Sequence, residues 1–137
     1  MPKCVTLRAF FRLYVIEMLN KIVYFCNTKV KQNMWDLSQN DWKTQLEGNN
    51  NAIVLDVRTN DEVAEGIIPN AVHIDIHLGQ GFIDEVEKLD KSKDYYVYCR
   101  SGGRSAQACA VMNHLGFENT YNLLGGITEW QGEITNS

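Results

Sequence analysis

The residues best suited to chemistry form one short run, residues 99–104, with the sequence CRSGGR. The run lies between a β-branched and aromatic stretch at residues 95–98 and a stretch with helical spacing. This position predicts that Cys99 ends a strand where a helix begins. The first turn of a helix offers unpaired N–H groups and the positive end of the helix dipole, and both stabilise an anion. We therefore expect Cys99 to be held as a thiolate.

The composition of this run suits an anion-binding loop. Gly102 and Gly103 have no Cβ atom, so the chain can curl tightly and turn the N–H groups of residues 100–105 toward one sulfur or a bound substrate. The two arginines of the run add positive charge. Together these effects predict that the pKa of Cys99 falls from about 8.5 into the range of about 3.5–7.5 found for activated cysteines.

Four neighbours of Cys99 are candidate substrate-binding side chains. Arg104 is expected to brace the loop or to hold an anionic substrate, the alternative being a solvated charge in the first helical turn. Arg100 is placed to attract the oxygens of a sulfonate group. Ser101 and Ser105 carry hydroxyl donors for a bound anion or for a sulfur atom added to Cys99. Ser105 is equally plausible as an ordinary residue of the first helical turn.

Two further polar residues are assigned to structural support. Asp56 follows an apolar run, and we expect it to orient loop amides or to pair with Arg58 rather than to act as a general acid. None of the three histidines is expected to act as a catalytic base. His114, for example, lies about 15 Å from Arg104 along the axis of the predicted helix, which is too far for a Cys–His pair.

Length, composition and charge narrow the function classes. The chain has 137 residues, of which 45% are hydrophobic, as expected for one compact domain with a real core. Residues 1–33 hold six Lys and Arg against one acid, whereas residues 34–137 hold seven against sixteen. The acidic balance of the larger part argues against nucleic acid as a partner.

The cysteines and the N-terminal segment suggest no special targeting. The four cysteines have no CxxC spacing, so we expect no zinc site, no thioredoxin-type motif and no cofactor, in a reduced, cytoplasmic setting. The apolar runs within residues 1–33 are shorter than the ~20 residues that cross a bilayer. We interpret this segment as an extension outside the fold, or as sequence upstream of the true start. Membrane-surface contact or organelle targeting through residues 1–33 is the alternative.

Helical and strand patterns alternate from residue 34 onward. Ser38 with Asp41 predicts a capped helix start, and Thr59 with Glu62 has the spacing of a capping box. Strands are predicted over residues 52–57, 72–76, 95–98 and 120–123, and helices over residues 38–47, 59–66, 82–89, 104–115 and 127–130. This alternation predicts an α/β fold in which a parallel sheet carries helices on both faces. Such sheets bind ligands at the carboxyl ends of their strands, where Cys99 is expected.

Four ordered segments of residues 34–137 resemble the single-domain rhodanese family of sulfurtransferases. Residues 56–58 read DVR, as in the family. The other matches are residues 62–71 (EVAEGIIPNA) to the family's E-x-x-x-G-H-I-P-G-A segment, residues 99–104 to its C-R-S-G-x-R active-site loop, and residues 125–130 to its closing G-G-x-x-x-W. Ile67 stands where the family has histidine, and Asn70 where it has glycine. Because that segment is structural in the family, these departures bear on local packing.

The resemblance implies a fold and a reaction. The fold would be a rhodanese-like domain with a parallel sheet of about five strands. In the implied reaction, Cys99 attacks the outer sulfur of a small anionic donor such as thiosulfate and becomes a persulfide. The persulfide then passes that sulfur to a thiol, cyanide or protein acceptor. A preformed thiolate needs no separate base for such exchange chemistry.

Two other functions remain open. The fold is shared with dual-specificity phosphatases and arsenate reductases, which also place a cysteine in a loop closed by an arginine. Here four residues separate Cys99 from Arg104, against five in the phosphatase pattern, and a shorter loop leaves less room for a phosphoryl group. The second alternative is a protein-binding module, or a persulfide carrier that serves one protein partner.

Overall fold

The computed structural model describes residues 34–136. In chain order the elements are β1 (Met34–Leu37), α2 (Gln39–Glu47), β2 (Ala52–Asp56), α3 (Asn60–Ala64), β3 (Val72–His73), η2 (Ile76–Leu78), α4 (Gln80–Glu87), β4 (Asp94–Tyr98), α5 (Gly103–His114), β5 (Asn119–Leu123) and η3 (Ile127–Glu129). No helix among these residues is long and apolar enough to span a membrane. The predicted extension at residues 1–33 lies outside the described residues.

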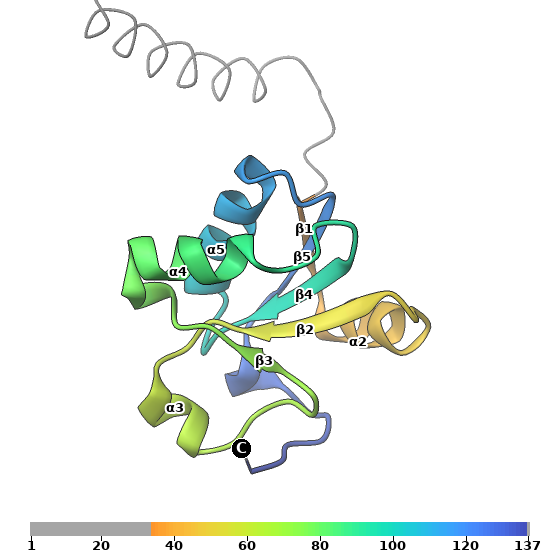
Figure 1. Cartoon of the computed structure of the whole chain (residues 1–137). Helices are drawn as coiled ribbons and strands as arrows, with labels where there is room; N and C mark the ends of the chain where they lie inside the picture. The colour runs from red at the N-terminus through yellow and green to blue at the C-terminus, as the bar shows by residue number, and fades with distance from the viewer. Residues whose placement is uncertain (1–33, 137) are drawn as a thin grey trace, which may run out of the picture. The chain divides into compact units, whose positions relative to one another are not determined.

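The strands form one parallel sheet with the order β1-β5-β4-β2-β3 (Figure 1). The central strand β4 pairs with β2 on one side and with β5 on the other. Because all strands run the same way, the loops that follow β2, β4 and β5 gather at one edge of the sheet. The α/β fold predicted from the sequence, with about five parallel strands, is confirmed.

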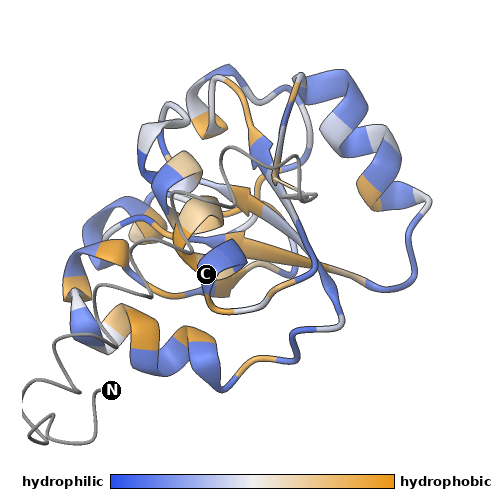
Figure 2. Cartoon of the chain, turned by 90° about the horizontal axis from the view of Figure 1, so that it is seen from above, coloured by the Kyte–Doolittle hydropathy of each residue, from blue (hydrophilic) through white to orange (hydrophobic). Residues whose placement is uncertain are grey.

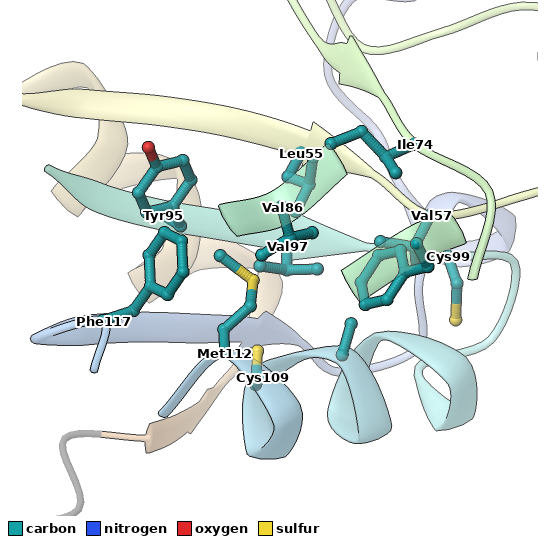
Figure 3. Close-up of a cluster of buried hydrophobic side chains, with 12 residues drawn as sticks. Leu55, Val57, Ile74, Val86, Tyr95, Val97, Cys99, Cys109, Met112 and Phe117 are labelled. Carbon is teal, nitrogen blue, oxygen red and sulfur yellow. The ribbon is translucent and has the colours of Figure 1, made fainter. Parts of the chain in front are cut away.

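Helices cover both faces of the sheet and divide the core into two clusters. On one face, α4 and α5 pack Phe82, Val86 and Met112 against Leu55 and Val97 (Figure 3). On the other face, α2 places Trp42 against a second set: Val54, Ile68, Tyr96, Tyr98 and Leu123. Figure 2 shows hydrophobic residues along the central strands and a mixture of hydrophilic and hydrophobic residues along the helices. Burial on both faces explains why β2 and β4 are continuous apolar runs.

The helix ends follow the local chemistry of the sequence. Ser38 accepts a hydrogen bond from the Asp41 N–H at the start of α2. Thr59 and Glu62 form the predicted capping box at the start of α3. Gly116 lies just after α5 with φ of 99°, a left-handed conformation that costs glycine little. These three predictions are confirmed.

Two strand predictions need correction. The strand expected over residues 72–76 has only Val72–His73, because the Asp75 carboxylate accepts the His77 N–H and starts the short helix η2. The edge strand β1 was not predicted at all. It has only four residues and pairs with β5, at the opposite end of the domain sequence.

The two departures from the family pattern are accommodated locally. Asn70 adopts φ of 66°, and asparagine enters this left-handed region more readily than most residues. Ile67 forms an antiparallel bridge with Thr135, in which each N–H donates to the other's carbonyl at 2.8 Å. The bridge ties the chain end to the segment after α3.

Candidate active site

Cys99 directly follows β4 at the carboxyl edge of the sheet, and α5 begins four residues later, at Gly103. Gly102 forms the N-cap of α5 with φ of 107°, and no side chain caps this helix end. Figure 3 shows Cys99 at one end of the apolar cluster, with Tyr95 and Phe117 at the other. The sequence prediction of a cysteine between a strand and a helix therefore holds in the structure.

The sulfur of Cys99 has polar partners. The Gly102 N–H donates to Sγ at 3.1 Å, and the Ser105 Oγ lies 3.3 Å from Sγ. Burial acts to raise the pKa of Cys99. Hydrogen bonds from the Ser105 hydroxyl and from the N–H groups of Ser105, Gly102 and Ser101 outweigh burial, so the pKa of Cys99 is lowered. Hydrogen bonds at the helix start, rather than the arginines, are the main cause of this lowering.

The sulfur is more enclosed than the sequence suggested. Cys99 is 1% exposed and belongs to the cluster that contains Val57, Val97 and Ala108. The sequence placed Cys99 correctly at the carboxyl end of a strand, but it did not indicate this degree of burial. An N–H and a hydroxyl contact the sulfur on the loop side, so its surroundings differ from the purely apolar ones that raise the pKa of a buried thiol.

Ser105 belongs to a buried hydrogen-bond network. Its hydroxyl lies 2.5 Å from the Asn122 Oδ1, on β5, and 3.2 Å from the Gly102 carbonyl. Asn122 in turn donates to the Asp36 carboxylate, on β1, at 2.9 Å and to the Gly102 carbonyl at 3.2 Å. Ser105 and Asn122 are almost fully buried. The network links the hydroxyl next to Sγ to two strands of the sheet.

Arg104 is an ion-pair partner rather than a solvated charge. Its two terminal nitrogens donate to the two carboxylate oxygens of Glu62 at 2.7 and 2.8 Å. The hydrogen bond from Arg104 and the smaller effect of Thr59 lower the pKa of Glu62 to about 2 against the opposing effect of burial. The loop that holds Cys99 is thereby fastened to the first turn of α3. This geometry corresponds to the bracing alternative for Arg104.

Arg100 is exposed, and among residues 34–136 its guanidinium makes no ion pair. The backbone of Arg100 is held by Thr128, because the N–H and the hydroxyl of Thr128 both donate to the Arg100 carbonyl, at 3.1 and 2.7 Å. The Ile127 N–H donates to the Cys99 carbonyl at 3.0 Å. A Cβ atom at Gly126 would lie 2.4 Å from the Arg100 carbonyl oxygen, so only glycine allows this contact.

Asp56 and Arg58 form a buried ion pair that supports the site. Arg58 Nη2 contacts the Asp56 carboxylate at 2.7 Å, and the Tyr98 hydroxyl donates to the same carboxylate at 2.6 Å. Arg58 also donates to the backbone carbonyls of Glu62 and Gly66. These contacts hold the segment that presents Glu62 to Arg104, and the geometry has the supporting character expected from the sequence.

The remaining titratable candidates make their contacts elsewhere and none forms a hydrogen bond to the sulfur among the described residues. His73 Nε2 lies 2.6 Å from the Arg58 carbonyl, and His77 contacts the Asp75 carboxylate. Cys109 is fully buried in the core, and burial raises its pKa to about 12. Within the part of the chain that the structure describes, no cluster of His, Cys, Asp and Glu could hold a metal ion.

Sequence reasoning missed three contributors to the site. They are Glu62 as the partner of Arg104, Asn122 as the partner of Ser105, and Thr128 as the donor to the Arg100 carbonyl. Glu62 was interpreted only as a capping residue. The one available signal for the second contributor was the position of Asn122 next to the end of a strand expected inside the sheet, because buried polar groups require partners.

Comparison with known proteins agrees with this geometry. The family described as "Rhodanese-like domain" matches residues 38–133. "Putative sulfurtransferase YtwF" of Bacillus subtilis is 43% identical over 91 residues, which are 66% of this chain and 84% of that protein. A "Sulfurtransferase" of Allochromatium vinosum is 37% identical over 86 residues, 63% of this chain and 78% of its own length.

A solved structure extends the similarity to the fold. The crystal structure of a rhodanese-like domain protein from Staphylococcus aureus superposes with a TM-score of 0.66 at 28% identity, covering 76% of this chain and 99% of that one. The family match includes the cysteine loop, the Glu62 segment and the closing Gly-Gly. This chain therefore belongs to the rhodanese family.

Proposed function

We propose that this protein is a sulfurtransferase that moves a sulfane sulfur through a persulfide on Cys99. Membership of the rhodanese family, together with relatives named as sulfurtransferases, supports sulfur transfer in general. The observation that carries the proposal is the sulfur at the uncapped start of α5, where N–H and hydroxyl groups lower its pKa. Thiosulfate is the proposed test donor, and a thiol, cyanide or a protein is the proposed acceptor.

The proposed first step balances without an added oxidant or reductant. The Cys99 thiolate forms a bond to the outer sulfur of thiosulfate, and the sulfur–sulfur bond of the donor breaks. The electron pair of that bond leaves with sulfite, so Cys99 becomes a persulfide anion. The N–H groups that lower the pKa of the thiolate then surround the anionic outer sulfur.

Access and donor binding follow from the exposure of the loop residues. Because Cys99 is only 1% exposed, the donor reaches the sulfur when the loop opens. Arg100 is exposed beside it and carries no ion pair among the described residues, so it is the proposed contact for the sulfonate oxygens. Ser101, Gly102 and Gly103 supply loop N–H groups, and Ser105 supplies a hydroxyl.

Mass spectrometry of the full chain tests this proposal. After thiosulfate treatment, we expect the wild type to gain one sulfur atom that cyanide removes, and the peptide containing Cys99 to carry it. Cys99→Ser should gain none. The matched control is Cys109→Ala, since Cys109 is buried with a raised pKa and should leave the adduct in place. An adduct that persists in Cys99→Ser, or one missing from the wild type with every sulfane donor tried, contradicts the proposal.

The enclosure of the sulfur also favours a second candidate, a persulfide carrier for one protein. A persulfide formed beneath the loop is sheltered from small acceptors in solution. Steady turnover of thiosulfate with cyanide supports the enzyme. A persulfide that forms once and resists cyanide in the folded protein, yet is released after unfolding, supports the carrier.

A further inference from the structure

The positive charge of Arg104 is already matched in the resting protein. The ion pair with Glu62 uses both terminal nitrogens of the guanidinium and both oxygens of the carboxylate. Their side chains are only 24% and 21% exposed. Glu62 is also held from its own helix, because the Thr59 hydroxyl donates to Oε1 at 3.1 Å. A two-point pair with a third anchor is a fixed feature rather than a passing surface contact.

The other charged groups near Arg104 do not restore a strongly positive site. The neighbouring charges come from the elements packed around the loop: Asp75 before η2, the pair formed by Asp56 at the end of β2 with Arg58, and the exposed Arg100. Asp75 acts on Arg104 in the same direction as Glu62. With Arg104 matched by Glu62, only Arg100 remains as a cation without an ion pair among these residues.

We propose that Glu62 is a specificity-determining residue that acts through Arg104. By matching the charge of this arginine, Glu62 weakens the attraction of the site for doubly charged oxyanions such as thiosulfate and sulfate. Donors that carry at most one negative charge, of which an organic persulfide is the chemical class, lose less of this attraction. This inference rests on the proposed sulfur transfer and adds a preference among its donors.

The same thiolate chemistry serves the favoured donor. Cys99 attacks the outer sulfur of a persulfide R–S–SH, a new sulfur–sulfur bond forms, and the donor's own sulfur–sulfur bond breaks. The electron pair leaves with R–S⁻, and the proton stays on the transferred sulfur. The leaving thiolate carries one negative charge, whereas sulfite carries two. A weakly positive site is therefore sufficient to stabilise the thiolate as it leaves.

Alkylation of Cys99 in Glu62→Gln tests the charge assignment without requiring sulfur transfer. Iodoacetate is an anion and iodoacetamide is its neutral counterpart, so the ratio of their rates at Cys99 reports the local potential. Mass spectrometry of the Cys99 peptide in the full chain follows both rates. We expect the ratio to rise roughly two- to fivefold in Glu62→Gln, the range for a partly exposed charge.

The KM for thiosulfate should fall by a similar factor with a smaller change in kcat, and sulfate should inhibit more strongly.

Three matched variants separate a charge effect from a structural one. Glu65→Gln removes the same charge from the exposed end of α3 and should leave the rate ratio unchanged. Glu62→Asp keeps the charge and should return the ratio toward the wild-type value. In an Arg104→Gln background, Glu62→Gln should no longer raise the ratio, because the arginine that it releases is absent.

The outcomes distinguish this inference from the proposed function. An unchanged or lower ratio in folded Glu62→Gln overturns the inference, as does an equal rise in Glu65→Gln. A raised ratio in a protein that never forms a persulfide supports the charge assignment but overturns sulfur transfer. A persulfide that forms normally, with no change in KM for thiosulfate in Glu62→Gln, overturns the specificity role and leaves the proposed function standing.

Discussion

Two helices begin next to each other in this domain, and their first turns are built in opposite ways. At the start of α3, Thr59 and Glu62 occupy free N–H groups with their own side chains, and the first turn contains two acids. At the start of α5, Gly102 provides no side chain and the first turn contains no acid. The ion pair between Arg104 and Glu62 joins the two turns.

The contrast shows how one type of structure serves two purposes. The free N–H groups of a helix start favour an anion. In α3 this preference is satisfied internally and stabilises the helix. In α5 it is left for the sulfur of Cys99, whose pKa is lowered as a result. The missing side-chain cap of α5 is the feature on which the proposed role of Cys99 depends.

The largest effect on this contrast is expected from Gly102→Ala. Gly102 has φ of 107°, and an added Cβ would lie 3.4 Å from the Leu123 carbonyl oxygen. We expect the free energy of unfolding to fall by about 1–3 kcal/mol and the pKa of Cys99 to rise, because the Gly102 N–H moves away from the sulfur. Denaturant unfolding and the pH dependence of iodoacetamide labelling measure both. Gly103→Ala, with nothing within 4 Å of its Cβ, should change neither the free energy of unfolding nor the pKa of Cys99 in this way.

Removing the cap of the other helix should affect stability alone. In Thr59→Ala the Glu62 N–H loses its side-chain acceptor, and we expect a loss of about 1 kcal/mol in the free energy of unfolding. The pH midpoint of Cys99 labelling should stay at the wild-type value, because Arg104 still holds Glu62. Ser38→Ala, which uncaps α2, should cost a similar amount. A shifted midpoint in Thr59→Ala would mean that the two helix starts are not independent.

The smallest effect is expected from giving α5 the kind of first turn that α3 has. Gly103→Asp adds an acid at the exposed first position of α5, where the helix dipole should favour it by about 0.3–1 kcal/mol. The same carboxylate should raise the pKa of Cys99, since two negative charges would share one helix start. Gly103→Asn, which has the same shape without charge, serves as the control. Equal labelling midpoints for Asp and Asn would show that the sulfur does not sense this end of the helix.

The sequence predicted the parts of this fold that depend on short-range chemistry. Both helix caps, the glycine after α5 and the central strands arise from residues that lie a few positions apart. The cysteine at a strand–helix junction belongs to the same class. For this reason the position of Cys99 between β4 and α5 and the direction of its pKa shift could be predicted without the structure.

The parts that escaped prediction depend on pairs that are distant in sequence. Glu62 and Arg104 lie 42 positions apart, and Asp36 and Asn122 lie 86 apart. A single sequence shows each partner by itself, so Glu62 was interpreted only as a cap and Asn122 only as part of a strand. The burial of the sulfur was missed for the same reason, because it results from how the loop packs against β2 and α5.

The pairing of β1 has a consequence for the order in which this protein can assemble. Among residues 34–136 its neighbour in the sheet is β5, which the ribosome makes much later. Ile127 and Thr128, whose N–H groups donate to the carbonyls of Cys99 and Arg100, are made later still. A growing chain that has just exposed Cys99 therefore lacks the folded surroundings that lower the pKa of its thiol. We expect the sulfur to behave as an ordinary thiol until residues 119–128 have been made and packed, which delays its reactivity until the fold can control it.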